Sequence, residues 1–365
     1  MRTVDALVVG GGPAGSTTAY RLATAGASVL LVDKARFPRD KPCGGGLTLR
    51  AVRQCPVDPT PVVEEHVDLL ELRFRYGNSV VRQAREPVVW MTQRRRLDAF
   101  LLDAARERGV EVREGTTVDV SKIAAHVIVG ADGANGTTAR AVGLGAGIVH
   151  GVAYEGNVPY GKLERERYAR RAVIEVADIP GGYGWVFPKA DHANVGVGGW
   201  QSEGPRLREH LRRVCEAHGL EPENLEELRG HRLPLRRPGT PIAAERALLV
   251  GDAAGLIDPV SGDGMYECFV SSRLAADAIL DLLAGRTTSL VPYQAEVDAE
   301  LASLHRASWL LKRALDRWPR ASWRLVRTAL LWRTVEGLLQ GELDTPDEQH
   351  GLARMPLRAL ARLGR

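Results

Sequence analysis

Short, wholly apolar runs alternate with a helical stretch at the start of the chain, and similar runs return further along. Residues 6–9 are apolar, as are all residues of 28–32 after Ser28, and a helical stretch at 16–25 lies between them. Two more apolar runs, 127–129 and 247–250, have the same character. Strands that are buried on both faces of a parallel sheet lose the alternation of polar and apolar residues. These runs therefore predict an α/β fold built on a parallel sheet.

From residue 292 onward the pattern becomes helical. Apolar residues recur at spacings of three or four until Pro319 interrupts them, at Leu301, Leu304, Ala307, Leu311, Leu315 and Trp318. Trp309 lies off this stripe, on the side of Arg306, Lys312 and Arg313. We prefer a helix packed on the preceding domain with a solvated basic face, because an apolar stripe usually faces a core. The alternative is an interfacial helix on a membrane, which the arginines and tryptophans further along favour.

Composition excludes several classes of protein. The chain has 365 residues, with 49 basic and 45 acidic side chains and a formal net charge of +4, which is too small to indicate nucleic-acid binding. Its four cysteines, Cys43, Cys55, Cys215 and Cys268, have no metal-binding spacing, so we expect no metal. No apolar run approaches the roughly 20 residues that span a bilayer. We expect a cytoplasmic protein, with peripheral membrane contact through the basic C-terminal helix as the alternative.

The first apolar run leads directly into a glycine-rich turn. Gly10, Gly12 and Gly15 form a GxGxxG pattern between a strand and a helix, with Pro13 and Ala14 inside it. This arrangement lets a pyrophosphate approach the backbone and the N–H groups at the start of the helix. The second run ends at Asp33, followed by Lys34, at the offset where an acid binds the ribose of a dinucleotide. We therefore expect all seven residues to contact a nucleotide cofactor.

Two later strand ends extend this cofactor site. Residues 127–129 precede Asp132 and Gly133, and residues 247–250 precede Gly251 and Asp252. The two blocks resemble the DG and GD motifs of FAD-dependent hydroxylases, so we expect non-covalent FAD rather than NAD. The alternative is that both aspartates only cap turns. Arg94 begins a helix where that superfamily often places an arginine near the flavin, although it also fits a solvated face.

These motifs divide the chain into three parts. The expected fold class is α/β, with a Rossmann-type FAD-binding domain, an inserted β-sheet substrate domain and a helical C-terminal segment. The substrate domain is suggested by β-like stretches at 70–76, 173–176 and 193–199. The expected boundaries are 1–65, 94–145 and 240–290 for the FAD-binding domain, 66–93 and 146–239 for the substrate domain, and 291–365 for the C-terminal segment.

Three further stretches carry a more specific resemblance. The first is Lys41, Pro42, Cys43, Gly44, Gly45 and Gly46, and the second is the PxxYxWxFP pattern from Pro180 through Tyr183, Trp185 and Phe187 to Pro188. The third continues the GD block through Asp258, Pro259, Ser261, Gly262, Gly264 and Tyr266. Together they resemble the geranylgeranyl reductase family, whose members saturate isolated double bonds in the isoprenoid chains of lipids, chlorophyll precursors and quinones.

The resemblance implies roles for these residues. Cys43 and Tyr183 become candidate proton donors, with Tyr266 as a further candidate. Gly44, Gly45, Gly262 and Gly264 would lie beside the cofactor together with Cys43, and Tyr183, Trp185 and Phe187 would form an apolar slot for the prenyl chain. The alternatives are an inert buried thiol at Cys43 and ordinary core packing of the three rings. The segment 116–126 is shorter than in relatives, and Asn135 and Gly136 depart from their DG block.

Three functions remain open on this scaffold, the third being a flavin-binding protein without catalysis, which would need an occluded or absent substrate cavity. The resemblance favours an FAD-dependent prenyl reductase acting on a lipid, quinone or terpenoid. The alternative is a flavin monooxygenase or halogenase-like enzyme. No second GxGxxG unit appears in the sequence, so the electron donor, NAD(P)H or a ferredoxin, is not assigned.

Overall fold

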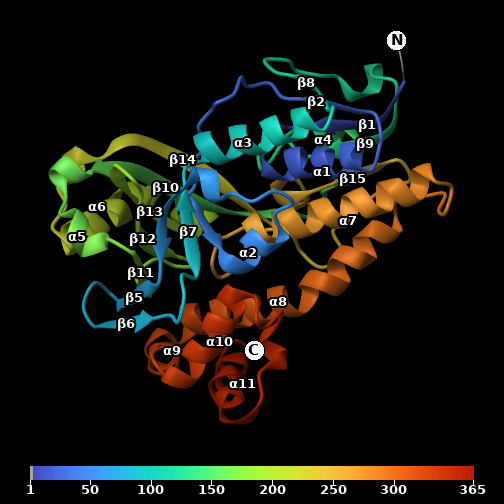
Figure 1. Cartoon of the computed structure of the whole chain (residues 1–365). Coiled ribbons are helices and arrows are strands. Elements are labelled where there is room, and N and C mark those ends of the chain that lie inside the picture. The colour runs from blue at the N-terminus through green and yellow to red at the C-terminus, as the bar shows by residue number, and fades with distance from the viewer. Residues whose placement is uncertain (1–2) are drawn as a thin grey trace.

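The computed structural model describes residues 3–365 and contains three β-sheets. The first is a five-stranded parallel sheet in the order β15-β9-β1-β2-β8 (Figure 1). Its strands are β1 (Val4–Val9), β2 (Val29–Val32), β8 (Glu111–Arg113), β9 (Ala125–Gly130) and β15 (Ala247–Leu249). The apolar runs in the sequence form four of these strands, so the expected parallel sheet is confirmed.

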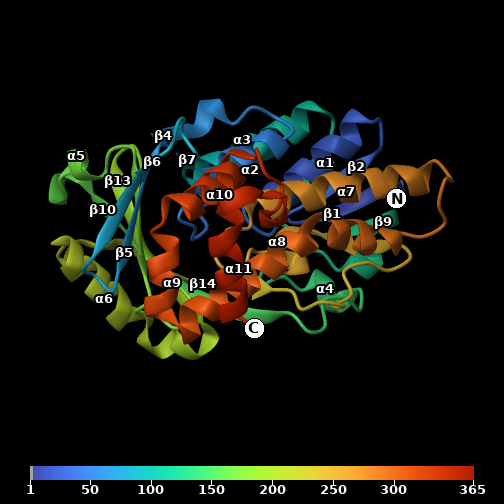
Figure 2. The same cartoon turned by 90° about the horizontal axis from the view of Figure 1, so that it is seen from below.

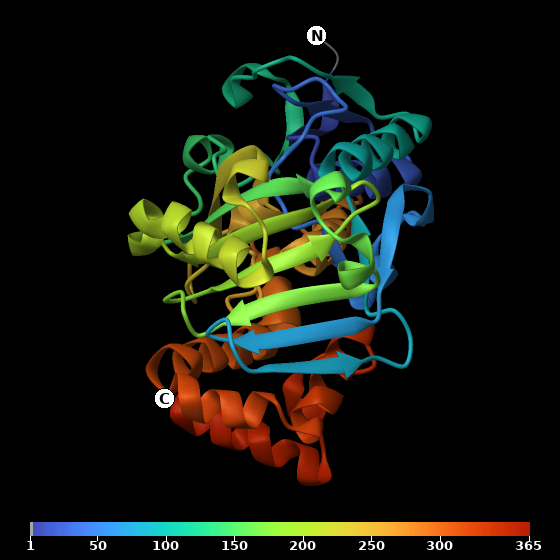
Figure 3. The same ribbon diagram turned by 90° about the vertical axis from the view of Figure 1, so that its left-hand side faces the viewer.

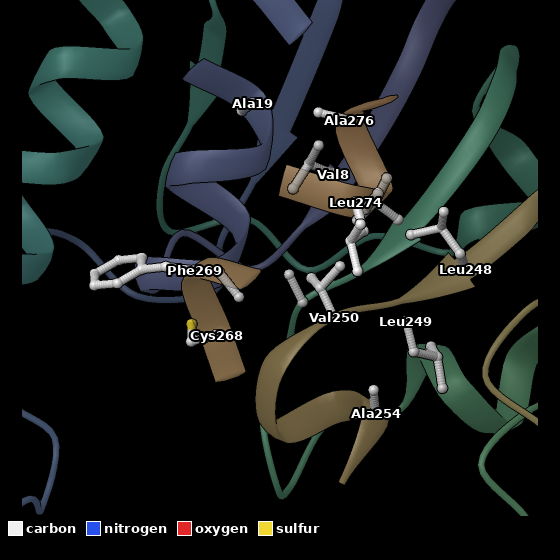
Figure 4. Close-up of a cluster of buried hydrophobic side chains, with 14 of the residues drawn as sticks. Val8, Ala19, Leu248, Leu249, Val250, Ala254, Cys268, Phe269, Leu274 and Ala276 are labelled. Carbon is white, nitrogen blue, oxygen red and sulfur yellow. The ribbon is translucent and has the colours of Figure 1, made fainter. Parts of the chain in front are cut away.

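Helices on the parallel sheet create the largest hydrophobic core. These are α1 (Pro13–Thr24), α3 (Arg94–Glu107), α7 (Met265–Leu283) and the short α4 (Thr138–Ala141). In Figure 4, Val8 of β1, Ala19 of α1, Leu248 of β15, and Phe269 and Leu274 of α7 belong to one cluster of buried side chains. Because α7 follows β15 in sequence but packs against α1, this core joins the first and the last parts of the nucleotide-binding fold.

The second sheet has seven strands in the order β14-β10-β13-β12-β11-β5-β6 (Figure 3). They are β5 (Leu69–Phe74), β6 (Ser79–Gln83), β10 (Val149–Pro159), β11 (Arg171–Val176), β12 (Tyr183–Pro188), β13 (His192–Trp200) and β14 (Glu226–Leu235). All neighbours are antiparallel except β11 and β5. The helices α5 (Arg165–Tyr168) and α6 (Leu207–His218) cover one face, where Leu211 and Val214 pack on Val195 and Val197.

A small third sheet has the order β3-β7-β4. It consists of β3 (Gly46–Thr48), β4 (Val63–Val67) and β7 (Val89–Thr92), and α2 (Leu49–Gln54) follows β3 directly. From the sequence, the whole segment 66–93 is expected to belong to the substrate domain. In the structure β7 instead pairs with β3 and β4, while β5 and β6 join the large sheet. Residue 46, at the end of the Cys43 segment, is therefore anchored to this small sheet.

The C-terminal segment is a bundle of four helices below the two larger sheets (Figures 1 and 2). The helices are α8 (Pro292–Arg317), α9 (Pro319–Val326), α10 (Ala329–Gln340) and α11 (Arg354–Leu363). Leu311 and Leu325 pack around Ala314, Leu331 and Leu360, so the bundle has a small core of its own. No helix among residues 3–365 has the length and apolar character needed to cross a membrane.

The basic side of α8 was expected to be solvated, but part of it contacts the large sheet. Lys312 is 8% exposed, donates a hydrogen bond to the Gly181 carbonyl, and lies 4.4 Å from the ring centroid of Trp200. Trp309 stacks on Trp200 at 6.1 Å between ring centroids, and Trp323 of α9 stacks on Phe74 at 5.4 Å. Leu301 and Leu304 of the apolar stripe belong to the core of the parallel sheet, so the expected packing on the preceding domain is confirmed. Lys312 and Trp309, expected on a solvated face, instead belong to the packed surface.

Candidate functional site

The glycine-rich turn between β1 and α1 is shaped by close backbone contacts. Gly10 has φ +111°, and a Cβ there would lie 2.3 Å from the Ala131 carbonyl oxygen. A Cβ on Gly15 would lie 1.8 Å from the Gly10 carbonyl oxygen. Neither position accepts a side chain, so the first turn of α1 is held tightly against the ends of β1 and β9.

The start of α1 suits a phosphate group. Gly12 is the N-cap, and no side chain caps the helix or places an acid in its first turn, so the helix N-terminus presents its N–H groups and positive dipole. A Cβ at Gly12 would meet only the ends of two arginine side chains, at 3.5 Å from Arg39 and 3.9 Å from Arg94. Pro13 and Ala14 form the first turn itself. These features fit the pyrophosphate of FAD.

Asp33 lies at the end of β2 and orders the same turn. Its Oδ2 accepts a hydrogen bond from the Gly11 N–H at 2.6 Å, and its Oδ1 accepts one from the Ala35 N–H at 2.7 Å. The carboxylate thus stands beside the glycine turn, where we propose that it binds the ribose. The neighbouring Lys34 is exposed.

Arg94 is buried, in contrast to the solvated face that three consecutive arginines also suggested. It is 7% exposed, whereas Arg95 and Arg96 are exposed. Its Nε and Nη2 each donate to the Asp98 carboxylate at 2.7 Å, and Arg39 lies 2.9 Å from the same carboxylate. The pair Arg39 and Arg94 therefore places positive charge opposite the start of α1, where a diphosphate would bind.

Asp132 caps a turn, which was the alternative interpretation of this residue. Its Oδ2 accepts from the Thr137 N–H at 2.7 Å and from the Thr138 N–H and hydroxyl at 2.9 and 2.8 Å. Its Oδ1 is buried without a hydrogen-bond partner among residues 3–365. A Cβ at Gly136 would lie 2.1 Å from the Asp132 Cγ. The glycine that departs from the family pattern is thus required by this carboxylate, and Gly133 has φ +74°.

Asp252 brings three distant segments together. It lies in the 3-10 turn η6 (Gly251–Ala254), just after β15. Its Oδ2 accepts a hydrogen bond from Lys41 at 2.8 Å and lies 4.0 Å from His231 Nε2 on β14. Burial raises the pKa of Asp252, but Lys41 and His231 outweigh it and hold this pKa well below its usual range. An ionised acceptor therefore stands at the end of the parallel sheet.

The loop after η6 continues this end of the site. Gly262 has φ +64°. Gly264 lies next to Asp252, because a Cβ added to it would be 3.4 Å from Asp252 Oδ1. Asp258 holds the loop by accepting from the Val260 and Ser261 N–H groups at 3.0 and 2.7 Å. The loop thus has the tight backbone that close approach of a ligand needs.

The structure places the Cys43 segment against the aromatic strand. A Cβ at Gly44 would lie 2.8 Å from Phe187 and 3.5 Å from the indole nitrogen of Trp185. The rings of Tyr183, Trp185 and Phe187 follow one another along one side of β12, at 5.9 and 6.2 Å between centroids. The two sequence stretches that carry the family resemblance, separated by about 140 positions in the chain, are therefore in direct contact.

Two of the candidate proton donors, Tyr183 and Cys43, form hydrogen bonds through their side chains. The Tyr183 hydroxyl donates to the Ser261 carbonyl, which ties β12 to the loop after η6. The Cys43 sulfur accepts a hydrogen bond from the Gly45 N–H at 3.4 Å, and Gly45 itself has φ +68°. Tyr266 is buried at the start of α7, under the Arg50 guanidinium at 4.4 Å. Among residues 3–365 no hydrogen bond or ring contact joins it to Cys43 or Tyr183.

Sequence reasoning missed two ionisable residues beside Cys43. Glu155 of β10 accepts a hydrogen bond from the Cys43 N–H at 2.6 Å, and Lys189 donates one to the Gly44 carbonyl at 2.6 Å. Glu155 is 8% exposed and Lys189 is 2% exposed. Lys189 directly follows Pro188, so its position at the end of the aromatic pattern was a usable signal. Glu155 had none, because its proximity to Cys43 depends on the sheet.

The contacts described above define the class of protein. A glycine turn at an uncapped helix, an ionised aspartate after β15 and an unpartnered Asp132 oxygen fit a dinucleotide laid across the ends of the parallel strands. Residues 3–122 match the FAD binding domain family. The protein is an FAD-dependent oxidoreductase.

Comparison with known proteins gives the family within this class. The chain is 30% identical over 302 residues to geranylgeranyl diphosphate reductase of Rhodobacter capsulatus, covering 76% of this chain and 75% of that protein. It is 29% identical over 357 residues to digeranylgeranylglycerophospholipid reductase 1 of Methanopyrus kandleri, covering 86% and 85%. The chain belongs to the geranylgeranyl reductase family.

A solved structure confirms the fold over nearly the whole chain. The crystal structure of a geranylgeranyl bacteriochlorophyll reductase-like protein from Thermoplasma acidophilum superposes with a TM-score of 0.82 at 23% identity. The superposition covers 99% of this chain and 100% of that one. The expected fold class, with its Rossmann-type domain, further sheets and C-terminal helices, is thus confirmed.

Proposed function

We propose that this protein is an FAD-dependent reductase that saturates isolated carbon–carbon double bonds in the prenyl chain of a lipid, quinone or terpenoid. The observation that supports this most directly is the contact between Gly44 and the rings of Trp185 and Phe187. It supports a site in which the Cys43 thiol lies next to an aromatic wall. An apolar chain needs such a wall, and an alkene that accepts hydride needs a nearby acid.

The cofactor site follows from the residues already described. We propose that Gly10, Gly12, Pro13, Ala14 and Gly15 bind the pyrophosphate, with Arg39 and Arg94 opposite it, and that Asp33 binds the ribose. Asp252 and the loop with Gly262 and Gly264 would hold the flavin end of FAD. Asp132 and Gly133 would hold the part of FAD between the pyrophosphate and the flavin. When bound and reduced, FAD supplies a hydride.

The chain's own residues supply the rest of the chemistry. An isolated alkene is a poor hydride acceptor, so a proton must reach the second carbon as hydride reaches the first. We assign that proton to the Cys43 thiol, which the Gly45 N–H holds in place. Trp185 is 7% exposed, and its indole N–H donates to Asn194 Oδ1 at 2.7 Å, so this ring is fixed and can exclude water from the reacting carbons.

Product analysis tests this function directly. Purified protein loaded with FAD is reduced with dithionite under anaerobic conditions and incubated with geranylgeranyl diphosphate or a prenylated phospholipid. Mass spectrometry should show added hydrogen pairs, and deuterium from heavy water should appear at the protonated carbon. Hydroxylated or halogenated product that forms only with oxygen would instead establish the monooxygenase or halogenase alternative.

A further inference from the structure

Two buried groups of opposite charge hold the Cys43–Gly44 peptide from its two ends. Glu155 accepts the Cys43 N–H and Lys189 donates to the Gly44 carbonyl, both at 2.6 Å. Neither group forms a direct ion pair within 4.0 Å in residues 3–365. A buried lysine without a carboxylate partner is costly and calls for an explanation beyond packing. A neutral amide would have fixed the same peptide at lower cost.

A small cavity connects these groups. It has a volume of about 40 Å³, enough for a water molecule, and its lining includes Cys43, Glu155, Lys189 and Asn194. The same cavity is lined by Asp40 and Glu227, which are exposed at the surface. A polar path of this size can hold an ordered water between solvent and the thiol.

We propose that Lys189 and Glu155 return a proton from solvent to Cys43 after each reduction. This rests on the proposed function, in which the Cys43 S–H bond breaks and its proton goes to the alkene carbon. The thiolate left behind then takes a proton through the cavity water from the Lys189 ammonium, so an N–H bond breaks and the S–H bond forms again. Glu155 passes a proton from solvent to the Lys189 amine. No electrons are transferred in these steps.

The protonation properties of the two groups suit this exchange. Burial lowers the pKa of Lys189 to about 8, against the attraction of Cys43, Glu64 and Glu155. Burial raises the pKa of Glu155 to about 7, with a further contribution from Asp40, against the Cys43 N–H, Lys189 and Asn194. Arg94 and Tyr183 also lie close enough to Cys43 for their charges to interact with its thiolate. Groups that titrate near neutral pH exchange protons most effectively there.

A comparison of first and later turnovers separates proton return from mere positioning. The first turnover uses the proton already on Cys43, whereas later ones require its return. In the pre-reduced Lys189→Met holoenzyme, flavin reoxidation by geranylgeranyl diphosphate should stay within about twofold of the parent, while the dithionite-driven steady-state rate falls about tenfold or more. Glu155→Gln, which keeps an acceptor for the Cys43 N–H, should show the same split.

Chemical rescue and a matched lysine provide controls. Methylamine in the buffer should restore much of the steady-state rate of Lys189→Met, because it can deliver a proton through the cavity. The control is Lys162→Met, which removes an exposed lysine of the same domain. It should leave both rates unchanged. Equal loss in first and later turnovers without rescue would show that Lys189 only holds the loop, and no loss in either would also overturn the proposal.

A second measurement is independent of reduction. A lysine ammonium beside a thiol favours the reactive thiolate, so iodoacetamide should alkylate Cys43 several-fold more slowly in Lys189→Met than in the parent. Peptide mapping distinguishes Cys43 from Cys55, Cys215 and Cys268. If the parent does not reduce prenyl substrates, the proposed function fails while this labelling still shows whether Lys189 acts on Cys43. Equal labelling rates in both proteins would by themselves overturn the proposed action of Lys189 on Cys43.

Discussion

At the scale of single residues, the three candidate proton donors differ in their contacts. The Tyr183 hydroxyl already donates to the Ser261 carbonyl, and burial raises the pKa of Tyr183 well above its usual range. Tyr266 lies under Arg50, and burial raises its pKa as well. Cys43 accepts a hydrogen bond from Gly45, which leaves its own proton available. These contacts favour Cys43 as the acid, which its sequence alone left open.

Substitution of Cys43 tests that ranking. We expect Cys43→Ser to lose part and Cys43→Ala most of the rate of single-turnover reoxidation by prenyl substrate, about 10²-fold for alanine, with FAD content retained. Reoxidation by oxygen in the same variants is the control and should not change. If Cys43→Ala reacts with substrate as fast as the parent, the role moves to Tyr183 or Tyr266, and a change in thermal stability alone would indicate a packing thiol.

Glu155 should make the stability of the protein depend on pH. Burial raises its pKa from 4.5 to about 7, so between these values the folded state binds more protons than the unfolded state and stability falls as pH rises. Glu155→Gln removes this dependence and keeps the acceptor for Cys43. We expect the variant to gain about 1–3 kcal/mol over the parent at pH 8 and much less at pH 5. Denaturant unfolding at both pH values measures this, and an equal gain at both would contradict the assignment.

At the scale of elements, sequence patterns predicted the positions of strands better than they predicted which strands pair. The apolar runs identified the parallel strands because both faces of that sheet are buried. The pairing of β7 with β3 was not foreseen, since it joins segments about 40 positions apart and no local pattern encodes it. Glu155 was missed for the same reason, whereas Lys189 directly follows the aromatic pattern and was overlooked there. Their contacts with the Cys43 segment exist only once β13 pairs with β10 on one side and β12 on the other.

A buried ion pair between α7 and α8 is another contact that the sequence did not predict. Glu267 is fully buried, and its Oε1 lies 3.5 Å from His305 Nε2. Burial lowers the pKa of His305, but Glu267 and Asp258 outweigh it and raise this pKa. The pair therefore stabilises the fold below the ordinary histidine pKa, and this contribution is lost as pH rises through the higher folded value.

The corresponding prediction concerns His305→Gln. The variant should be destabilised by about 1–2 kcal/mol at pH 6, and the difference from the parent should shrink at pH 9. Melting curves of the FAD-loaded proteins at both pH values provide the measurement. Arg306→Gln, which changes the exposed neighbour, serves as the control. A loss that stays constant over this range would mean that His305 contributes by packing and not by its charge.

At the scale of the whole molecule, the C-terminal bundle determines what surface is left for a membrane. Trp309 and Trp323 stack on the large sheet, so they are not free to enter a lipid interface. Trp318 is 48% exposed, and Arg313, Arg317 and Arg324 are exposed on α8 and α9. The segment therefore combines the packing that the apolar stripe predicted with a basic outer surface. We propose that this surface attracts anionic lipids mainly by charge.

Vesicle binding decides whether that surface meets a membrane. Replacing Arg313, Arg317 and Arg324 by glutamate should abolish flotation with anionic vesicles and leave the flavin spectrum unchanged, because each basic residue near such a surface contributes about 1 kcal/mol. Binding of the parent should weaken with salt and vanish with neutral vesicles. Trp309→Ala is the matched control, since loss of its stacking on Trp200 should lower the melting temperature without changing the outer charge. Parent protein that fails to float with anionic vesicles at low salt would leave the four helices with packing as their only role.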